Sequence, residues 1–357
     1  LPYLLVKTLS PEAAYFHSLT TQTDHLPKTA TLSLDPHITA VSLLKSVSYV
    51  LLFGLTLLLV NGHQRLLWLA YTLVFSGLFQ AVYGSLMTLS GLEYSFVHHK
   101  FTGIGVATGT FVNRNHLAGY LEMSLAVGIG LLIAFLSDAG DLTWRQRLRT
   151  WLNWVLSSKM RLRLYLVMMV IALVLTRSRM GNTAFFASLM AAGLIGLILS
   201  RHATRATMVL LVSLIIIDLL VVGTWFGIEK VKQRLEQTSL ATESRDEVDI
   251  YTIPYWRDYY LTGSGLGSFY SVFPRYRGED IQGYYDHAHN DYVEFGAETG
   301  LIGLLLLGSS VALSLWTALR AQHRRRDSLC RGMAFSAIMG IIALGIHSTV
   351  DFNLQIP

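Results

Sequence analysis

Hydrophobic positions in this chain fall into long, nearly uncharged runs separated by polar stretches. An α-helix rises 1.5 Å per residue, so crossing about 30 Å of hydrocarbon takes roughly 20 apolar residues. Backbone amides find no water inside a bilayer, so such runs must form helices rather than open strands. Eight runs therefore predict membrane-spanning helices, at residues 38–60, 66–89, 116–137, 164–180, 184–199, 207–227, 291–319 and 332–350.

These runs predict an all-α fold, a polytopic transmembrane helical bundle with one large outer loop region between the sixth and seventh spans. Composition agrees, because 14% of the residues are charged against about 25% in soluble domains. We divide the chain into an N-terminal segment, six helices, the large loop, and two helices with a tail, at residues 1–37, 38–227, 228–290 and 291–357. Because the chain starts at Leu1 with no signal-peptide pattern, we expect further helices upstream.

The distribution of basic residues predicts the orientation. Half of all Lys and Arg, 14 of 28, lie in four short connections, at residues 61–65, 138–163, 200–206 and 320–331. The positive-inside rule makes this face cytoplasmic. Topology therefore explains the modest net charge of +5, and nucleic-acid binding is not needed to account for it. The chain has a single cysteine, Cys330, which excludes an internal disulfide.

The turn at 176–182 contains two arginines, Arg177 and Arg179, between apolar runs of 13 and 16 residues. Neither run crosses the hydrocarbon alone, so we expect this turn to dip below the outer surface. An arginine at that depth costs at least about 2.5–3.5 kcal/mol unless it is paired. Either both side chains extend to the lipid headgroups, or they form a site for an anion such as a lipid-linked phosphate.

The large loop is acidic near its start and aromatic further on. We interpret Glu243, Asp246, Glu247 and Asp249 as a solvated surface, because their spacing matches no dedicated divalent-metal site. The aromatic residues predict an interfacial belt, a platform for sugar rings, or both. They are Tyr251, Tyr255, Trp256, Tyr259, Tyr260, Phe269, Tyr270, Phe273, Tyr276, Tyr284 and Tyr285.

A glycine-rich segment, residues 263–268, lies in the same loop. It has no Walker lysine and follows no strand pattern, so a tight turn is favoured over a nucleotide site. His287 and His289 follow, where the loop re-enters the membrane. A zinc site would need a third ligand that the sequence does not offer, whereas a general base fits histidine, which titrates near neutral pH. The structural alternative is a role in capping the next helix, with Asn290 or Asp291 as the N-cap.

Two further polar clusters fall on the predicted outer face, at residues 113–116 and 347–353. For each, the sequence leaves open a satisfied helix terminus or a contribution to the site around His289. The candidate binding residues, in addition to the catalytic candidates discussed below, are Arg177, Arg257, His287, Asn113, Arg114, His116, Tyr292, His347 and Asp351.

Taken in order, these motifs resemble the superfamily of bacterial O-antigen ligases and O-antigen polymerases. The matching pieces, which span most of the chain from about residue 100, are Phe111 to Tyr120, Ser178-Arg179, Ser244-Arg245 ahead of Gly263 to Gly267, His289-Asn290-Asp291-Tyr292 with Glu298-Thr299-Gly300, and His347 with Asp351-Phe352-Asn353. Any single match would be weak, but their joint order, with helices between them, is fairly specific.

The resemblance implies a metal-independent, inverting glycosyltransferase without a cofactor, at the periplasmic face of the bacterial inner membrane. Its donor would be a glycan on undecaprenyl diphosphate, and its acceptor either lipid A core or another glycan. The family's catalytic residues map onto Arg179 and Arg245, which would bind the diphosphate, and onto His289, which would deprotonate the acceptor hydroxyl. Arg177 and Arg257 are further candidates for the anion site, and the sequence does not rank them.

Two other classes remain as alternatives. A transporter or flippase for an anionic lipid-linked glycan would place charged residues along both halves of the membrane, with broken helices near the midplane. Here the polar clusters gather on one face, which favours one-sided chemistry. A metal-dependent transferase would lose activity in EDTA.

Overall fold

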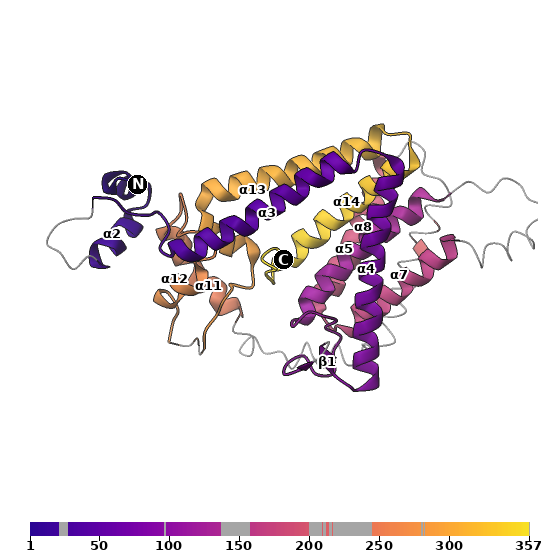
Figure 1. Ribbon diagram of the computed structural model, residues 1–357, viewed down its shortest axis with the longest axis horizontal. Helices are drawn as coiled ribbons and strands as arrows, with labels where there is room; N and C mark the ends of the chain where they lie inside the picture. The colour runs from indigo at the N-terminus through magenta and orange to yellow at the C-terminus, as the bar shows by residue number, and fades with distance from the viewer. Residues whose placement is uncertain are drawn as a thin grey trace, which may run out of the picture. The chain divides into compact units, whose positions relative to one another are not determined.

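The computed structural model describes residues 1–20, 28–95, 98–136, 158–199, 245–279 and 283–356, and also residues 209, 212, 213, 216 and 281. Helices dominate the described residues, where the one strand pair is a short hairpin of β1 (Tyr94–Ser95) and β2 (His98–His99) (Figure 1). The all-α prediction is confirmed. The chain divides into two compact units. Unit 1 comprises Leu1–Leu59, Glu236–Ala312 and Ser348–Pro357, and unit 2 comprises Val60–Leu235 and Leu313–His347.

Each unit combines segments that are distant in the sequence. Unit 1 contains α1 (Tyr3–Leu9), α2 (Pro11–Thr20), α3 (Pro36–Leu59), α11 (Arg245–Asp258), α12 (Phe269–Val272), the 3-10 turn η2 (Phe273–Arg275) and the first part of α13 (Asp291–Arg324). Unit 2 contains α4 (His63–Ser90), the β1–β2 hairpin, α5 (Arg114–Ala134), α7 (Ser158–Leu175), α8 (Arg179–Leu199), the end of α13 and α14 (Ser328–His347).

Six described helices are long and apolar enough to cross a membrane: α3, α4, α5, α8, α13 and α14. They coincide with six of the eight predicted spans. The run at 164–180 also forms a helix, α7, but it begins earlier and carries Lys159, Arg161 and Arg163 in its first turns. The run at 207–227 lies almost entirely outside the described residues.

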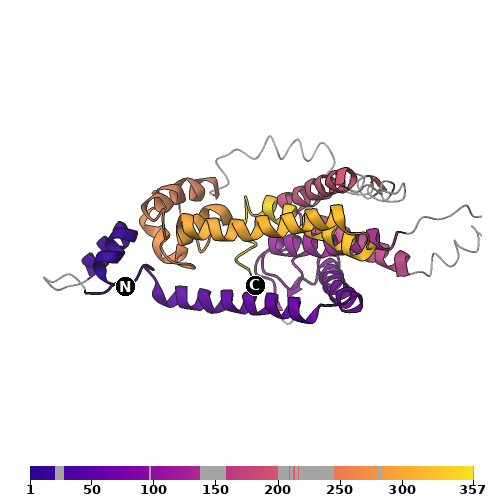
Figure 2. The same ribbon diagram turned by 90° about the horizontal axis from the view of Figure 1, so that it is seen from above.

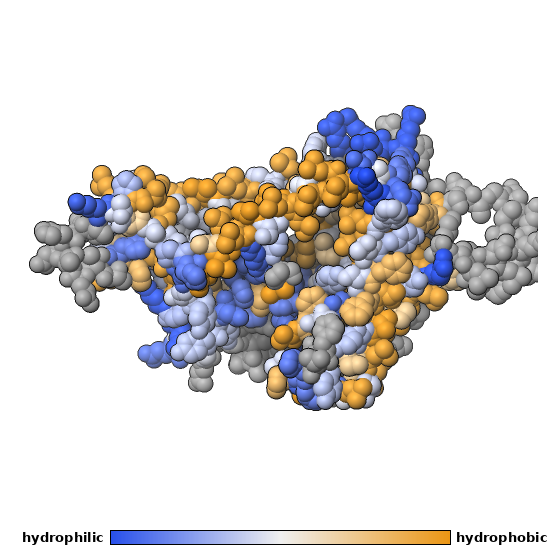
Figure 3. All heavy atoms as spheres, in the orientation of Figure 1, coloured by the Kyte–Doolittle hydropathy of each residue, from blue (hydrophilic) through white to orange (hydrophobic). Residues whose placement is uncertain are grey.

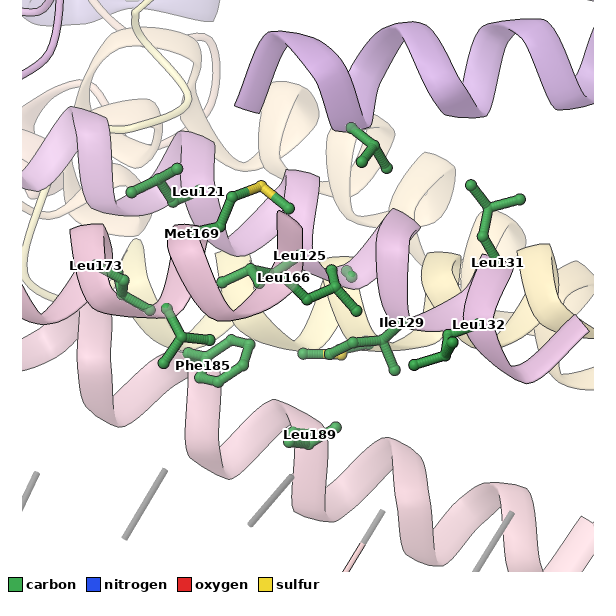
Figure 4. Packing of buried hydrophobic residues seen from close by; sticks show 14 of the residues in the cluster. Leu121, Leu125, Ile129, Leu131, Leu132, Leu166, Met169, Leu173, Phe185 and Leu189 are labelled. Atoms are coloured by element: carbon green, nitrogen blue, oxygen red, sulfur yellow. The ribbon is translucent and has the colours of Figure 1, made fainter. Parts of the chain in front are cut away.

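In unit 2, α5 is the central helix and packs against α4, α7, α8 and α14. Its leucines and isoleucine recur every four residues and meet the other helices in one hydrophobic core. Figure 4 shows Leu121, Leu125 and Ile129 with residues of α7 and α8, among them Leu166, Met169, Phe185 and Leu189. The four-residue interval places these apolar side chains on one face of α5, and that face forms the core.

Small residues let α5 and α14 approach closely. A Cβ added at Gly130 would lie 1.9 Å from Ser336 Oγ and 2.2 Å from the carbonyl oxygen of Gly332. No side chain fits at such a separation, so these glycines determine the helix spacing. Close approach through small residues is the usual way for helices to associate within a membrane, where apolar burial gains little.

The outward-facing character of α3 contrasts with that of α5. No residue of α3 is buried, although the helix is strongly apolar. Its exposed residues include Leu51, Leu52 and Phe53. Figure 3 shows this part of the surface covered largely by hydrophobic residues. A helix that is apolar on all sides and exposed in the protein fits a lipid environment.

Unit 1 has a separate core built largely from aromatic residues of the loop. Tyr255, Tyr259, Phe269 and Phe273 are all at most 2% exposed. Phe269 and Phe273 stack with ring centroids 4.8 Å apart, and the rings of Tyr255 and Tyr276 lie 5.2 Å apart. For these buried residues the interpretation as a membrane belt or sugar platform is wrong. They contribute packing, as aromatic rings do in most cores.

The glycine-rich segment forms the predicted tight turn. Gly263, Gly265 and Gly267 all have φ between 72° and 113°, a region that disfavours side chains. Ser268 N donates to Gly265 O at 3.0 Å, and a Cβ at Gly263 would lie 2.0 Å from the carbonyl oxygen of Glu298. The turn is therefore packed directly against α13.

Helix α13 changes direction at Gly300, where φ is 63° and ψ is −171°. Leu301 N donates outside the helix, to Tyr260 O at 2.7 Å. The predicted single span from residue 291 is thus corrected to a short polar helix followed by a long apolar one that ends at Arg324. Figure 2 shows α13 in orange. The break keeps the acidic residues Asp291, Glu294 and Glu298 ahead of the apolar run.

Candidate functional site

The loop that carries the two histidines is anchored at the start of α13. Asn290 is the N-cap, because its Oδ1 accepts from Tyr292 N at 3.1 Å and from Val293 N at 3.4 Å. Of the two capping residues that the sequence suggested, the structure selects Asn290. Asp291 N donates to Ser348 O at 3.0 Å, and the Asp291 carboxylate accepts from Leu354 N at 3.2 Å. These bonds tie the segment after α14 to the beginning of α13.

The same segment brings Asp351 to His289. His289 Nδ1 lies 3.4 Å from Asp351 Oδ1, and the Asp351 side chain is fully buried while that of His289 is 18% exposed. The Phe352 ring contacts the His289 ring edge-on, with centroids 4.8 Å apart. Because Nδ1 faces the carboxylate, Nε2 is the nitrogen left to exchange a proton with a substrate.

The backbone of His289 is held in an uncommon conformation. Its φ is 59°, and only Glu93 and Arg177 share a positive φ among the described residues other than glycine. This conformation costs free energy and persists where the surroundings enforce it, which happens often at functional sites. Here the bonds of Glu294 and Asn290 on either side enforce it.

His287 has a different partner. Its Nδ1 lies 2.7 Å from Glu294 Oε1, and Glu294 Oε2 accepts from Ala288 N at 2.8 Å. The ring stacks on Phe352 with centroids 4.2 Å apart. Burial opposes the charged form of the ring, but the hydrogen bond and charge of Glu294 outweigh it and raise the pKa of His287 above its ordinary value. His287 is therefore suited to keeping its proton near neutral pH rather than to accepting one.

One contact connects this loop to the helix that begins with Arg245. Asn290 Nδ2 donates to Asp249 Oδ2 at 3.2 Å. Asp249 is therefore not part of a solvated acidic surface, as the sequence suggested. Asp249 lies four residues after Arg245, and residues four apart share one face of a helix. Arg245 thus starts the face of α11 that meets the histidine loop; its side chain lies outside the described residues.

Arg257 belongs to the other end of α11 and is exposed. Arg257 is eight residues beyond Asp249, which corresponds to about 12 Å along the helix axis. Arg257 therefore lies far along α11 from the residue that contacts Asn290, whereas Arg245 lies about one turn from it. Tyr292 is half exposed in the first turn of α13.

The arginine turn belongs to unit 2 and is built by side-chain caps. Ser178 Oγ accepts from Gly181 N at 3.1 Å, and Thr176 Oγ1 accepts from Ser178 N at 3.1 Å. These bonds start α8 at Arg179 and leave Arg177, with a φ of 53°, in the turn. Both hydroxyls are buried, whereas both arginines are exposed.

The charges of Arg177 and Arg179 are uncompensated within the part of the chain that the structure describes, since neither forms an ion pair there. They stand at the N-terminus of α8, where free backbone amides and the helix dipole also favour negative charge. Two guanidinium groups with no carboxylate partner, at the positive end of a helix, are suited to an anion such as a phosphate.

The cluster at 113–116 starts α5. Asn113 Oδ1 accepts from Asn115 N at 2.9 Å, which confirms the helix-terminus interpretation for Asn113. Arg114 is exposed and His116 is partly buried in the first turn. The substrate-binding roles expected for Arg114 and His116 stay predictions.

His347 and Asp351, which the sequence grouped together, have separate partners. His347 Nδ1 lies 2.9 Å from Glu122 Oε1, and both side chains are fully buried between α14 and α5. His347 therefore has no contact with solvent in this structure. Glu122 was not among the residues expected to be functional, although an acidic residue inside the apolar run at 116–137 is a signal in the sequence. A membrane helix keeps such a group only with a partner or a function.

Within the described residues, no three His, Cys, Asp or Glu side chains come together as metal ligands would. The described site thus consists of two histidine–carboxylate pairs that share Phe352, with α11 attached to them through Asn290. The arginine turn belongs to unit 2 and by itself forms an exposed positive surface.

The comparison with protein families bears on this arrangement. The family model described as O-antigen ligase matches residues 164–308. This range contains the arginine turn, α11, both histidines and Glu294. No curated protein matches the chain. The match confirms the resemblance that the motifs indicated.

Proposed function

We propose that this chain, whose residues 164–308 match the O-antigen ligase family model, transfers a glycan from undecaprenyl diphosphate to an acceptor hydroxyl with inversion at the anomeric carbon. The observation that carries the proposal is the pairing of His289 with buried Asp351, in a loop joined to the helix that begins with Arg245. The six long apolar helices make the chain a multi-pass membrane protein. We place the reaction on the periplasmic side of the inner membrane, where the positive-inside rule puts these residues.

His289 acts as the general base in this proposal. Asp351 holds Nδ1, so Nε2 takes the proton of the acceptor hydroxyl. The carboxylate also stabilises the imidazolium that results, as the aspartate of a catalytic triad does. A positioned base contributes typically about 10²- to 10⁴-fold in rate. His287 is the weaker candidate, because Glu294 raises its pKa and favours the protonated ring.

The acceptor oxygen then attacks the anomeric carbon from the face opposite the diphosphate. A new C–O bond forms, the bond to the diphosphate oxygen breaks, and its electron pair leaves with the diphosphate. The proton stays on His289. The leaving group gains negative charge, so fixed positive groups near it accelerate the reaction.

The arginines supply this charge. Arg245 lies on the face of α11 that contacts Asn290 through Asp249. Arg179 and Arg177 offer exposed guanidinium groups at the N-terminus of α8. Guanidinium binds two phosphate oxygens at once, so we propose that Arg245 and Arg179 bind the diphosphate and that Arg177 assists. Because these charges replace a metal ion, transfer should survive EDTA.

The acceptor decides between ligase and polymerase. The decisive experiment incubates the purified protein with glycan-bearing undecaprenyl diphosphate, either alone or with lipid A core. A ladder of longer glycans from the donor alone identifies a polymerase, and transfer only to lipid A core identifies a ligase. Movement of the donor across a vesicle membrane without any new glycosidic bond would identify a flippase and overturn the proposal.

A further inference from the structure

A cluster of two tyrosines and an arginine lies on the surface of unit 1, outside the contacts described for the site. We propose that Tyr270, Tyr284 and Arg277 form a subsite for a sugar that carries a carboxylate, within the glycan that the proposed transferase handles. The inference rests on the proposed function for the identity of the ligand class, but it can be tested by binding alone.

These tyrosines differ from the aromatic residues of the core. Tyr270 is 50% exposed and Tyr284 is 79% exposed, whereas Tyr255 and Tyr259 are buried. The two exposed rings lie 6.4 Å apart at an interplanar angle of 40°, so they present a shallow aromatic surface together. A tyrosine ring offers an apolar face for the C–H groups of a sugar and a hydroxyl for hydrogen bonding.

Arg277 is fixed beside this surface. Its Nη1 donates to the carbonyl oxygen of Gly283 at 2.7 Å, and its guanidinium carbon lies 5.7 Å from the centre of the Tyr284 ring. Gly283 has a φ of 108°, a backbone conformation that residues other than glycine rarely adopt. The orientation of the Gly283 carbonyl, which accepts the hydrogen bond from Arg277, therefore depends on glycine at this position.

The charge of Arg277 has no carboxylate partner among the described residues. One N–H of the guanidinium is used by Gly283, and others remain for a ligand. A held guanidinium prefers a planar carboxylate, with which it forms two parallel hydrogen bonds. An aromatic surface beside such a group selects an acidic sugar over a neutral one.

The position along the chain connects the cluster with the reaction. Tyr284 precedes His287 by three residues, so their Cα atoms are at most about 11 Å apart. A glycan whose end reaches the histidine loop therefore passes within reach of Tyr284. The cluster would bind a sugar near the reacting end and would favour acidic glycans.

The test measures binding of two soluble probes to the full-length protein in detergent micelles, by saturation-transfer NMR. Oligogalacturonate supplies the carboxylate, and maltohexaose is the neutral control. We expect the wild type to bind oligogalacturonate more tightly. Arg277→Gln should weaken that binding by about 10-fold or more, because it removes a hydrogen-bonded charge pair, and should leave binding of maltohexaose unchanged.

Tyr284→Ala should weaken the binding of both probes, and Tyr284→Phe should retain most of it. Tyr260→Ala is the matched control, since Tyr260 is similarly exposed in unit 1 but lies in the turn that follows α11. Equal affinity of all variants, or no preference for the acidic probe in the wild type, would overturn the subsite. Quenching of the tyrosines by brominated lipid, with no binding of sugar, would assign the rings to the membrane interface instead. If the sugar probes do not bind this cluster but the protein still transfers glycan, the subsite is wrong and the proposed function is unaffected.

Discussion

The loop that carries His287 and His289 and the turn that carries Arg177 and Arg179 differ in whether their ionisable side chains have a partner of opposite charge. His287 and His289 each face a buried carboxylate, and the loop between them is tied down by side-chain hydrogen bonds. Arg177 and Arg179 are exposed on a capped helix start and form no ion pair within the described residues. A base needs a fixed ring and a partner that stabilises the charge it gains, whereas an anion site needs positive charge that no protein group neutralises. Each region therefore suits a different one of the two roles proposed above, the base and the anion site.

The largest effects should come from removing the proposed base or the arginine that begins α11. His289→Ala and Arg245→Ala should each abolish measurable glycan transfer, which means a fall in the transfer rate of about 10²-fold or more. The first variant lacks the base, and the second lacks the charge that stabilises the leaving diphosphate. The measurement is transfer by purified protein that still inserts into membranes and keeps its thermal midpoint.

Arg257→Ala is the matched control for Arg245, because it removes the same side chain from the far end of the same helix. It should retain near wild-type transfer. Substantial transfer by His289→Ala, or equal losses for both arginines, would contradict the proposed site.

The arginine turn itself can be tested by charge and shape. Arg179→Ala should lower transfer by about 10²-fold, and Arg179→Lys should recover part of it, since lysine keeps the charge but cannot bind two phosphate oxygens in the same way. The loss should appear with both acceptors, because the diphosphate belongs to the donor. If Arg179→Ala changed only the choice of acceptor, the anion-site assignment would fail.

The partner of the base has a smaller, diagnostic effect. Asp351→Asn should lower transfer by about 10- to 100-fold, because it removes the charge from a hydrogen bond to His289 without changing its shape. Transfer by Asp351→Asn at the wild-type rate would show that Asp351 has only a packing role.

The smallest effect concerns the pairing of His287 with Glu294. Because the folded pKa of His287 is raised, this pair stabilises the protein fully below the unfolded value, about 6.5, and loses its effect as pH rises through the folded pKa. The difference in thermal midpoint between wild type and His287→Gln should therefore shrink as pH rises. A difference that grows with pH, or does not change, would exclude a charged His287.

Much of the fold could be predicted from the sequence. Apolar runs give spans because hydrocarbon demands internally bonded helices of a minimum length, and six of the eight predicted spans are described helices of that kind. Local signals also worked for the tight turn at Gly263 to Gly267 and for the caps at Asn113 and Asn290. Each of these depends only on residues within a few positions of one another.

Predictions that depended on burial were less successful. The aromatic loop appeared uniform in the sequence, but Tyr255 is buried while Tyr284 is exposed. Helix α13 appeared as one span, and the backbone angles at Gly300 divide it. For α13 the outcome is decided by another segment, the turn around Leu261 and Gly263 that packs against Glu298 and Gly300.

The sequence by itself determined the class of the protein, the helices and the order of its motifs, because hydrophobic length and residue type act locally. Only the tertiary structure decided which carboxylate faces which histidine. Asp351 is 62 residues from His289, and Glu122 is 225 residues from His347. Such pairings depend on where the chain returns in space, and burial then makes each of them strong, because a buried ionisable group is costly without its partner.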